Sequence, residues 1–297
     1  MNSSVDSLII QLNSIQTSLT RYVMIPIYIF GTFANLANLI LFSQRIFRSA
    51  NACSYYFIGL SIANLIFIDI GGLARSLLAL ANLNLEITSI VFCKWRLYFA
   101  NFGLLLNRVF VCLISIDRWM VTSANESIRR RSSPQNARRV AIVVTCLTVI
   151  FSLHAAIGFD IKMNRCYALL NITYGVFFSI YNVLSVIIPL LIMIFSSLLI
   201  LVNIRRSRRR IQTESIVSNV LQPKQMKPNQ SMDMQFLRLI LVQSLTFAIL
   251  NLAFVGYVLY DFITNKQVKS SNQQAIEVFV YGVTIHPLYL FSAVRNS

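Results

Sequence analysis

Long apolar stretches alternate with short polar segments along the chain. Four of these stretches carry no charged residue, and they cover 22–43, 140–159, 174–204 and 239–260. A helix of about 20 apolar residues crosses the roughly 30 Å hydrocarbon core of a bilayer, because each residue advances it by about 1.5 Å. Each stretch therefore predicts one membrane-spanning helix.

Three further stretches are long and apolar enough to span a membrane although they contain charges. They cover 53–80, 97–116 and 274–294, and the charged residues within them are Asp69, Arg75, Arg108 and Glu277. All seven runs are continuous rather than alternating over about ten residues, which favours helices over the strands of a membrane barrel. The pattern predicts an all-α fold, a bundle of seven transmembrane helices.

The positions of Lys and Arg predict which side each loop faces, because short basic loops stay in the cytoplasm. The links after spans one, three and five hold most of them, namely Arg45, Arg48, Arg129, Arg130, Arg131, Arg138, Arg139, Arg205, Arg206, Arg208, Arg209, Arg210, Lys224 and Lys227. The N-terminal segment and the links after spans four and six hold few, namely Arg21, Lys162, Arg165, Lys266 and Lys269. We therefore expect an extracellular N-terminus and a cytoplasmic C-terminus.

The sequence predicts one membrane domain, at 22–294, with a polar segment before it and another after it. Residues 1–21 are expected to form an extracellular N-terminal tail, and residues 295–297 a short C-terminal end. The segment 205–233 begins with basic residues and continues with Gln, Ser, Asn, Lys and Pro, a composition that cannot bury a core. It predicts a mobile cytoplasmic loop, which either contacts anionic lipid heads or docks a partner.

Composition agrees with a membrane protein and argues against two other classes. The chain is 56% hydrophobic and 12% charged, whereas soluble domains have about a quarter charged residues. Its net charge of +16 lies in blocks between apolar stretches rather than on one solvated face, which argues against a nucleic-acid partner. The two histidines, His154 and His286, are far apart in sequence and form no cluster that an enzyme could use. We expect no catalytic activity, cofactor or metal.

Three features around the third span occur in a fixed register. Asp117-Arg118-Trp119 stands at its cytoplasmic end, Cys93 lies 25 residues before Arg118 at its outer end, and Cys166 follows in the loop after span four. Over about residues 20–294 the chain resembles the rhodopsin-like family of G-protein-coupled receptors, in which these positions hold an Asp-Arg-Tyr motif and a disulfide. The resemblance implies a plasma-membrane receptor with a bond between Cys93 and Cys166.

The resemblance also implies roles for the residues at the cytoplasmic end of span three. In the family the aspartate holds the arginine in the resting state, and opening of span six frees the arginine to meet a heterotrimeric G protein. Carried over, Asp117 is the latch, Arg118 the contact and Trp119 the third residue of the coupling motif. The alternative is that the Asp-Arg pair only solvates a helix end.

Weaker matches predict a set of residues in the bundle core. By helical spacing, Ala100, Asn107 and Arg118 share the inward face of span three, and the core set is Asn35, Asn64, Asn107, Arg108, Pro189, His286 and Pro287. Asn64 replaces the family's aspartate, and span six lacks the family's Trp-x-Pro pair. Arg108 must face the interior, paired with Asp69, Asn64 or His286 or hydrated, because a charge at mid-membrane costs at least about 2.5 kcal/mol.

The outer half of the bundle predicts the kind of ligand. Amine receptors of the family place an aspartate eighteen residues before the arginine of the motif, and Ala100 stands there. The candidate pocket residues instead combine both charges with aromatic rings: Asp69, Arg75, Lys94, Arg96, Tyr98, Phe99, Ala100 and Glu277. By similarity to invertebrate neuropeptide receptors, we expect a short peptide. Alternatively, these charges only snorkel to lipid head groups.

Two further expectations concern glycans and a different function. Asn2 and Asn171 each begin an Asn-x-Ser/Thr acceptor on the predicted outer side. The main functional alternative is a transporter or channel, in which Asp69 and Arg108 line a pathway across the membrane.

Overall fold

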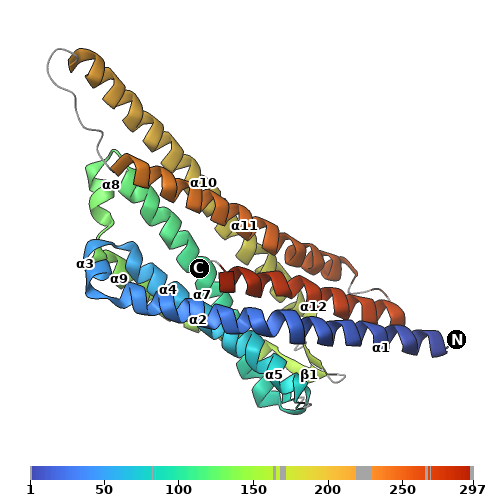
Figure 1. Ribbon diagram of the computed structural model, residues 1–297. Helices are drawn as coiled ribbons and strands as arrows, with labels where there is room; N and C mark the ends of the chain where they lie inside the picture. Colours follow the sequence, from blue (N-terminus) through green and yellow to red (C-terminus); the bar gives the residue numbers. More distant parts are fainter. Residues whose placement is uncertain are drawn as a thin grey trace.

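The protein is an elongated bundle of long helices with one short hairpin (Figure 1). The computed structural model describes residues 2–81, 83, 85–162, 165–167, 172–218, 229–264, 267 and 269–294. In chain order its elements are α1 Asn2–Leu19, the π-helix η1 Thr20–Met24, α2 Ile25–Ser43, α3 Arg45–Ala50, α4 Cys53–Leu65, the π-helix η2 Ile66–Leu73, α5 Ala74–Leu80, α6 Leu85–Thr88, α7 Ile90–Thr122, α8 Glu126–Arg131, α9 Pro134–Gly158, β1 Asp160–Lys162, β2 Arg165–Tyr167, α10 Ile172–Ser218, α11 Asn229–Thr264 and α12 Ser271–Val294.

Within the described residues, seven helical segments are long and apolar enough to cross a membrane. They coincide with the seven predicted spans, so the predicted all-α bundle is confirmed. The first segment joins α1, η1 and α2, and the second joins α4, η2 and α5. Segments three to seven are α7, α9, α10, α11 and α12.

The helices are longer than the apolar pattern predicts. The expected tail at 1–21 is helical from Asn2 and continues directly into the first span. The expected loop at 205–233 is helical up to Ser218 and again from Asn229. With 47 residues and about 1.5 Å per residue, α10 is about 70 Å long, and in Figure 1 its end projects beyond the other helices. Hydropathy marks only the part of a helix that lies in lipid, which explains the difference.

The third span, α7, is the centre of the bundle. It packs against α4, η2, α9 and α10, and about half of its residues are buried. The close approach of α4 to α7 depends on Gly103, because a Cβ there would lie 2.9 Å from the carbonyl oxygen of Ala63 and 2.9 Å from the backbone nitrogen of Phe67. Small residues allow such contacts between membrane helices.

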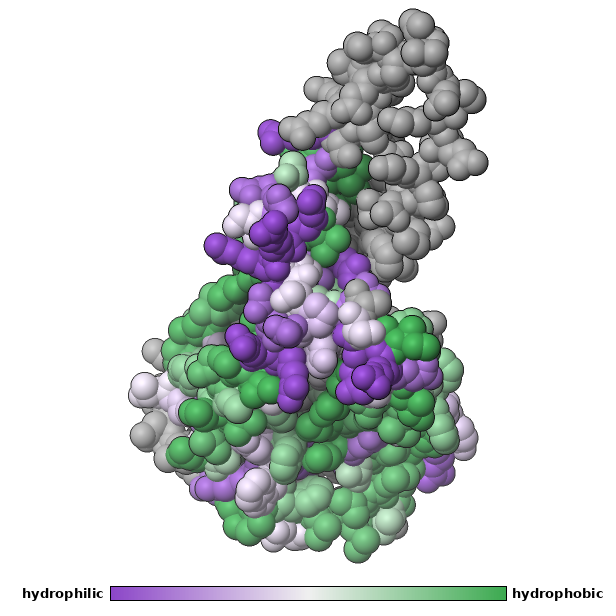
Figure 2. Space-filling view, turned by 90° about the vertical axis from the view of Figure 1, so that its left-hand side faces the viewer, coloured by the Kyte–Doolittle hydropathy of each residue, from purple (hydrophilic) through white to green (hydrophobic). Residues whose placement is uncertain are grey.

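The outer surface is largely apolar. Large hydrophobic side chains are exposed along α2, α9, α10 and α11, among them Phe33, Leu147, Ile150, Phe195 and Leu252. Figure 2 shows hydrophobic residues over the broad lower part of one face, with hydrophilic residues gathered toward the end where α10 projects. This distribution suits a bundle whose sides face lipid and whose ends face water.

Candidate functional site

A disulfide joins the start of α7 to the hairpin that follows α9. Cys93 lies in the first turn of α7, which begins after Ser89, whose side chain accepts a hydrogen bond from the backbone N–H of Phe92 (3.3 Å). Cys166 lies on β2 opposite Ile161 of β1 in an antiparallel pair. The two cysteines are bonded, with 5.8 Å between their Cα atoms. The predicted disulfide is therefore present, and it ties the hairpin to α7 at what we call the disulfide end.

At the opposite end of α7, the Asp-Arg pair is held by α4 and by the segment after α8. The buried Asp117 accepts a hydrogen bond from the hydroxyl of Ser132 (2.6 Å), and its other carboxylate oxygen lies 3.8 Å from the guanidinium of Arg118. Arg118 also directs its Nε to the sulfur of Cys53, 3.1 Å away on α4. Its side chain remains 19% exposed. Trp119 is half-buried and packs against α10 at Ile200.

Three asparagines and a serine link four helices in the middle of the bundle. We call this set, Asn35, Asn64, Asn107 and Ser292, the asparagine network; each member is at most 1% exposed. Asn64 donates to the side-chain oxygen of Asn35 (2.9 Å) and accepts from Asn107. Ser292 of α12 receives two contacts, from Asn35 to its carbonyl (3.2 Å) and from Asn107 to its hydroxyl (3.5 Å). The network joins α2, α4, α7 and α12.

Arg108 is buried as predicted, but its predicted partners are wrong. It is 1% exposed, and neither Asp69 nor His286 pairs with it. Its guanidinium instead donates to the hydroxyl of Ser185 on α10 and to the side-chain oxygen of Asn251 on α11 (3.3 Å). The reason is the rotation of α7, which directs this side chain toward α10 and α11.

The remaining predicted core residues lie in α10 and α12. Pro189 is buried inside α10, and Pro287 lies inside α12. His286, which precedes Pro287, is only partly buried. Tyr289, two residues after Pro287, is buried and stacks on the ring of Phe67 in η2, with the ring centroids 4.3 Å apart.

Three candidates for the ligand pocket are buried against neighbouring helices. Arg96 donates from its guanidinium to the carbonyl of Gly71 in η2 (3.3 Å), and Ala100 lies against the same glycine. Tyr98 directs its hydroxyl to the carbonyl of Val149 on α9 (3.4 Å). These three side chains hold helices together rather than lining an open cavity.

The other candidates from α5, α7 and η2 differ in exposure. Asp69 is half-buried and accepts a hydrogen bond from the hydroxyl of Thr32 on α2 (2.6 Å). Arg75 is exposed on α5, and both Lys94 and Phe99 are half-buried on α7. Asp69 and Arg108 have different partners on different helices, so they do not form the charge pair considered above.

The last candidate, Glu277, belongs to a charged cluster where α11 is followed by α12. Lys269 lies 2.8 Å from the Glu277 carboxylate and 3.8 Å from that of Asp261. The hydroxyl of Tyr260 donates to Glu277 (2.9 Å), and the Lys269 ammonium lies 5.7 Å from the centre of the Tyr260 ring. This cluster connects the two helices at the disulfide end.

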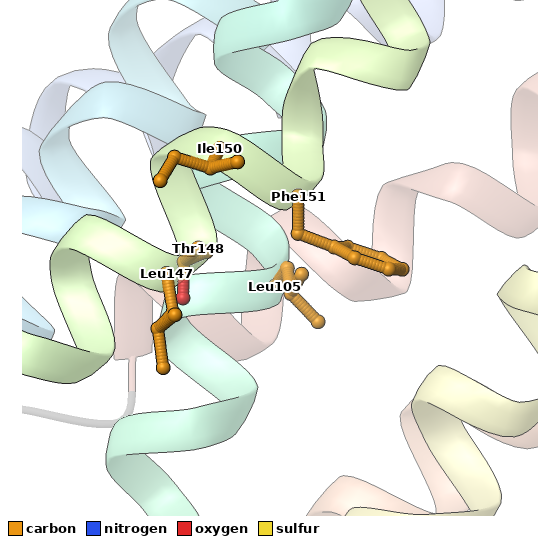
Figure 3. A pocket seen from close by; sticks show the side chains of 5 residues that line it. All are labelled: Leu105, Leu147, Thr148, Ile150 and Phe151. Atoms are coloured by element: carbon orange, nitrogen blue, oxygen red, sulfur yellow. The ribbon is translucent and has the colours of Figure 1, made fainter.

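Two hollows among the described residues lie away from the predicted pocket. One, of about 390 Å³, is a shallow apolar depression on the outside of the bundle, lined by Leu105 of α7 and by Leu147, Thr148, Ile150 and Phe151 of α9 (Figure 3). The other, of about 270 Å³, lies between α1 and α12 and is lined by Ile9, Leu12, Asn13, Gln16, Ser271, Gln274, Ala275, Val278 and Phe279. The first faces lipid, since Leu147 and Ile150 are more than half exposed.

Within the described residues, seven membrane-spanning segments with α7 at their centre, and a disulfide from α7 to the hairpin after α9, define a seven-span membrane protein of receptor type. The sequence pattern of the 7 transmembrane receptor (rhodopsin family) matches residues 34–289. The chain therefore belongs to this family, as the resemblance implied. It is a multi-pass plasma-membrane protein and a signalling receptor of the G-protein-coupled class rather than an enzyme. No curated protein sequence matches the chain.

Sequence reasoning missed several residues that contact the predicted site. Cys53 and Ser132 contact the Asp-Arg pair, Ser185 and Asn251 bind Arg108, and Ser292 completes the asparagine network. The signal for Asn251 and Ser185 was present, since polar residues within apolar spans usually face the bundle interior. Which of them meets Arg108 depends on helix rotation, which composition does not specify.

Proposed function

We propose that this receptor activates a heterotrimeric G protein through the end of α7 that carries Arg118. The observation behind the proposal is the geometry of that residue, a guanidinium 19% exposed at a helix end and held by a carboxylate 3.8 Å away. At 3.8 Å this contact is longer than a charge-assisted hydrogen bond, so it can be exchanged for a partner's acceptor. Asp117 keeps its bond to Ser132 when Arg118 leaves.

A transporter or channel is the second candidate, and the contacts of the intramembrane charges argue against it. A conduction pathway needs polar groups that follow one another through the bundle. Asp69 binds Thr32 on α2, whereas Arg108 binds α10 and α11. The asparagine network between them is bonded within itself. Guanine-nucleotide exchange compared with ion flux in the same membranes separates the two functions.

The orientation is part of the proposal: the disulfide end is extracellular and the Arg118 end is cytoplasmic. Asn2 precedes the first span, and Asn171, which lies outside the described residues, follows the hairpin in the sequence. We expect Asn2→Gln and Asn171→Gln to remove glycan mobility shifts. Asn125 and Asn229 also begin acceptor motifs but lie on the other side, so a shift lost on replacing either one contradicts this orientation.

We further propose a short peptide as the ligand. The outer end offers exposed or half-buried charges of both signs, with Arg75 and Lys94 near α5 and α7 and the cluster of Lys269, Glu277 and Asp261 near α11 and α12. Ala100 supplies no counter-ion for an amine. Several separated charges suit a ligand with several polar contacts better than a small monoamine.

The ligand proposal is tested by applying amidated peptides and monoamines to cells that express the receptor with a promiscuous G protein. We expect a peptide response that weakens when Lys94 is replaced by Ala. A response to a monoamine at submicromolar dose without any peptide response ends the proposal.

A further inference from the structure

Arg108 is the largest side chain among those that are almost completely buried. It lies one residue after Asn107 but outside the asparagine network. No carboxylate pairs with it in the part of the chain that the structure describes, and its Nε has no hydrogen-bond partner there. Its two contacts are both neutral oxygens, from Ser185 of α10 and Asn251 of α11.

These contacts connect three helices through one side chain. A guanidinium presents several donors in a fixed planar fork, so one nitrogen reaches α10 while another reaches α11. Near these bonds Val186, Met193 and Phe247 pack in the same hydrophobic cluster, and the Cys112 thiol of α7 lies 4.0 Å from the Pro189 carbonyl of α10. Apolar packing in lipid is weakly directional, whereas a hydrogen bond from a buried cation is specific in distance and angle.

The arrangement is not the one that maximises stability. A buried cation is most stable with a carboxylate and with all its donors satisfied, and Arg108 has neither. A hydrogen bond that fixes the position of a helix and can still be broken suits a helix that moves during function. Of the two neutral partners, Asn251 lies on α11, which runs alongside α10 (Figure 1).

We propose that Arg108 is a positioning residue that clamps α10 and α11 to α7 and sets the resting position of α11. The inference rests on the proposed G-protein coupling, since displacement of α11 at the Arg118 end is the step that the clamp controls. Release of the Asn251 bond frees α11, and a stronger bond at the same place holds it.

Two substitutions at Asn251 test the clamp in opposite directions. Asn251→Leu removes the acceptor, and we expect the active population to rise roughly threefold, the shift that corresponds to one interhelical hydrogen bond in a membrane. Asn251→Asp gives Arg108 a carboxylate, and we expect the active population to fall roughly tenfold, because charge-assisted bonds are stronger. Ser115→Ala is the matched control, since this buried hydroxyl of α7 bonds only to the carbonyl of Val111 in its own helix among the described residues.

Two readouts on the full-length receptor separate the clamp from the coupling. Spin labels are placed on cysteines introduced at two exposed positions, Ala124 just after α7 and Val242 within α11, in a Cys146→Ser background. Double electron–electron resonance then reports the distance from the end of α7 to α11. Basal nucleotide exchange on a co-reconstituted G protein reports coupling. A shift in distance without exchange supports the clamp and contradicts the proposed function.

A purely structural role for Arg108 predicts a different result. Both Asn251 variants would then lower expression, and the distance distribution would not change or would change in the same direction for both. Either result overturns the clamp. The effect of Asn251→Asp must also disappear in the Arg108→Gln background, and its persistence there overturns the clamp as well. If Arg108→Gln does not reach the membrane, the opposite shifts of the two Asn251 variants decide.

Discussion

Replacing Asn64 by Leu tests whether the asparagine network holds the bundle together. Leucine has a similar volume but neither donates nor accepts, so the change removes the bond to Asn35 and the bond from Asn107. Asn64 is 0% exposed, and water cannot replace either partner in the centre of the bundle. Asn107 keeps its contact with Ser292, which at 3.5 Å is long.

The magnitude follows from the two bonds that are lost. Interhelical hydrogen bonds in a membrane protein average about 0.6 kcal/mol, so two of them give a lower bound of about 1 kcal/mol. An unsatisfied buried group costs about 1–3 kcal/mol, so two of them give an upper bound of about 6 kcal/mol. We expect Asn64→Leu to lower the free energy of unfolding by an amount between these bounds.

The buried thiols of Cys53 and Cys112 provide the assay, since they are 2% and 7% exposed and react with a fluorogenic maleimide only after unfolding. The exposed Cys146 is replaced by Ser in all samples. Thr145→Val is the matched control, because the Thr145 hydroxyl bonds to the carbonyl of Ala141 in its own helix. An Asn64→Leu protein that unfolds at the same temperature as the unmodified receptor, or at a higher one, refutes the reasoning.

Two further predictions concern the packing of α7. Cys93→Ser should reduce surface expression much more than Cys112→Ser, because a bond that closes a separation of 73 residues contributes about 2–4 kcal/mol; finding free Cys93 and Cys166 thiols at the cell surface would contradict it. Gly103→Ala should lower thermal stability, because the new Cβ meets backbone atoms of Ala63 in α4 and Phe67 in η2 at 2.9 Å, whereas Gly256→Ala meets nothing within 4 Å and should not. Equal unfolding temperatures for the two alanine variants would show that α4 and α7 do not approach so closely.

The sequence predicted the seven spans because each has to be apolar over the thickness of a bilayer. It did not predict where α10 and α11 end, since a helix that leaves the membrane loses the hydropathy signal but not its backbone hydrogen bonds. It also did not predict the two π-helices, η1 and η2. These details depend on packing between helices.

The sequence likewise predicted some residues of the candidate site and missed others. The resemblance to the family implied the disulfide and the roles of the Asp-Arg pair, and helical spacing predicted the inward position of Asn107, which is buried. The candidate partners Asp69, Asn64 and His286 were wrong because the rotation of α7 directs the Arg108 side chain to Ser185 of α10 and Asn251 of α11. Tyr98 and Arg96 are buried rather than exposed to a ligand, since helix rotation determines the exposure of each side chain and the sequence constrains it only loosely.

We propose that the end of α7 couples this receptor to a G protein through Arg118. The most direct measurement is guanine-nucleotide exchange on a purified heterotrimer, with receptor reconstituted in lipid nanodiscs and ion flux measured in matched vesicles. Arg130→Ala is the control, because Arg130 is an exposed arginine that pairs with Glu126 within the same short helix, α8. We predict that Arg118→Ala abolishes exchange at unchanged surface expression, while the unmodified receptor and Arg130→Ala retain it. Full exchange by Arg118→Ala, or ion flux in place of exchange, would contradict the account.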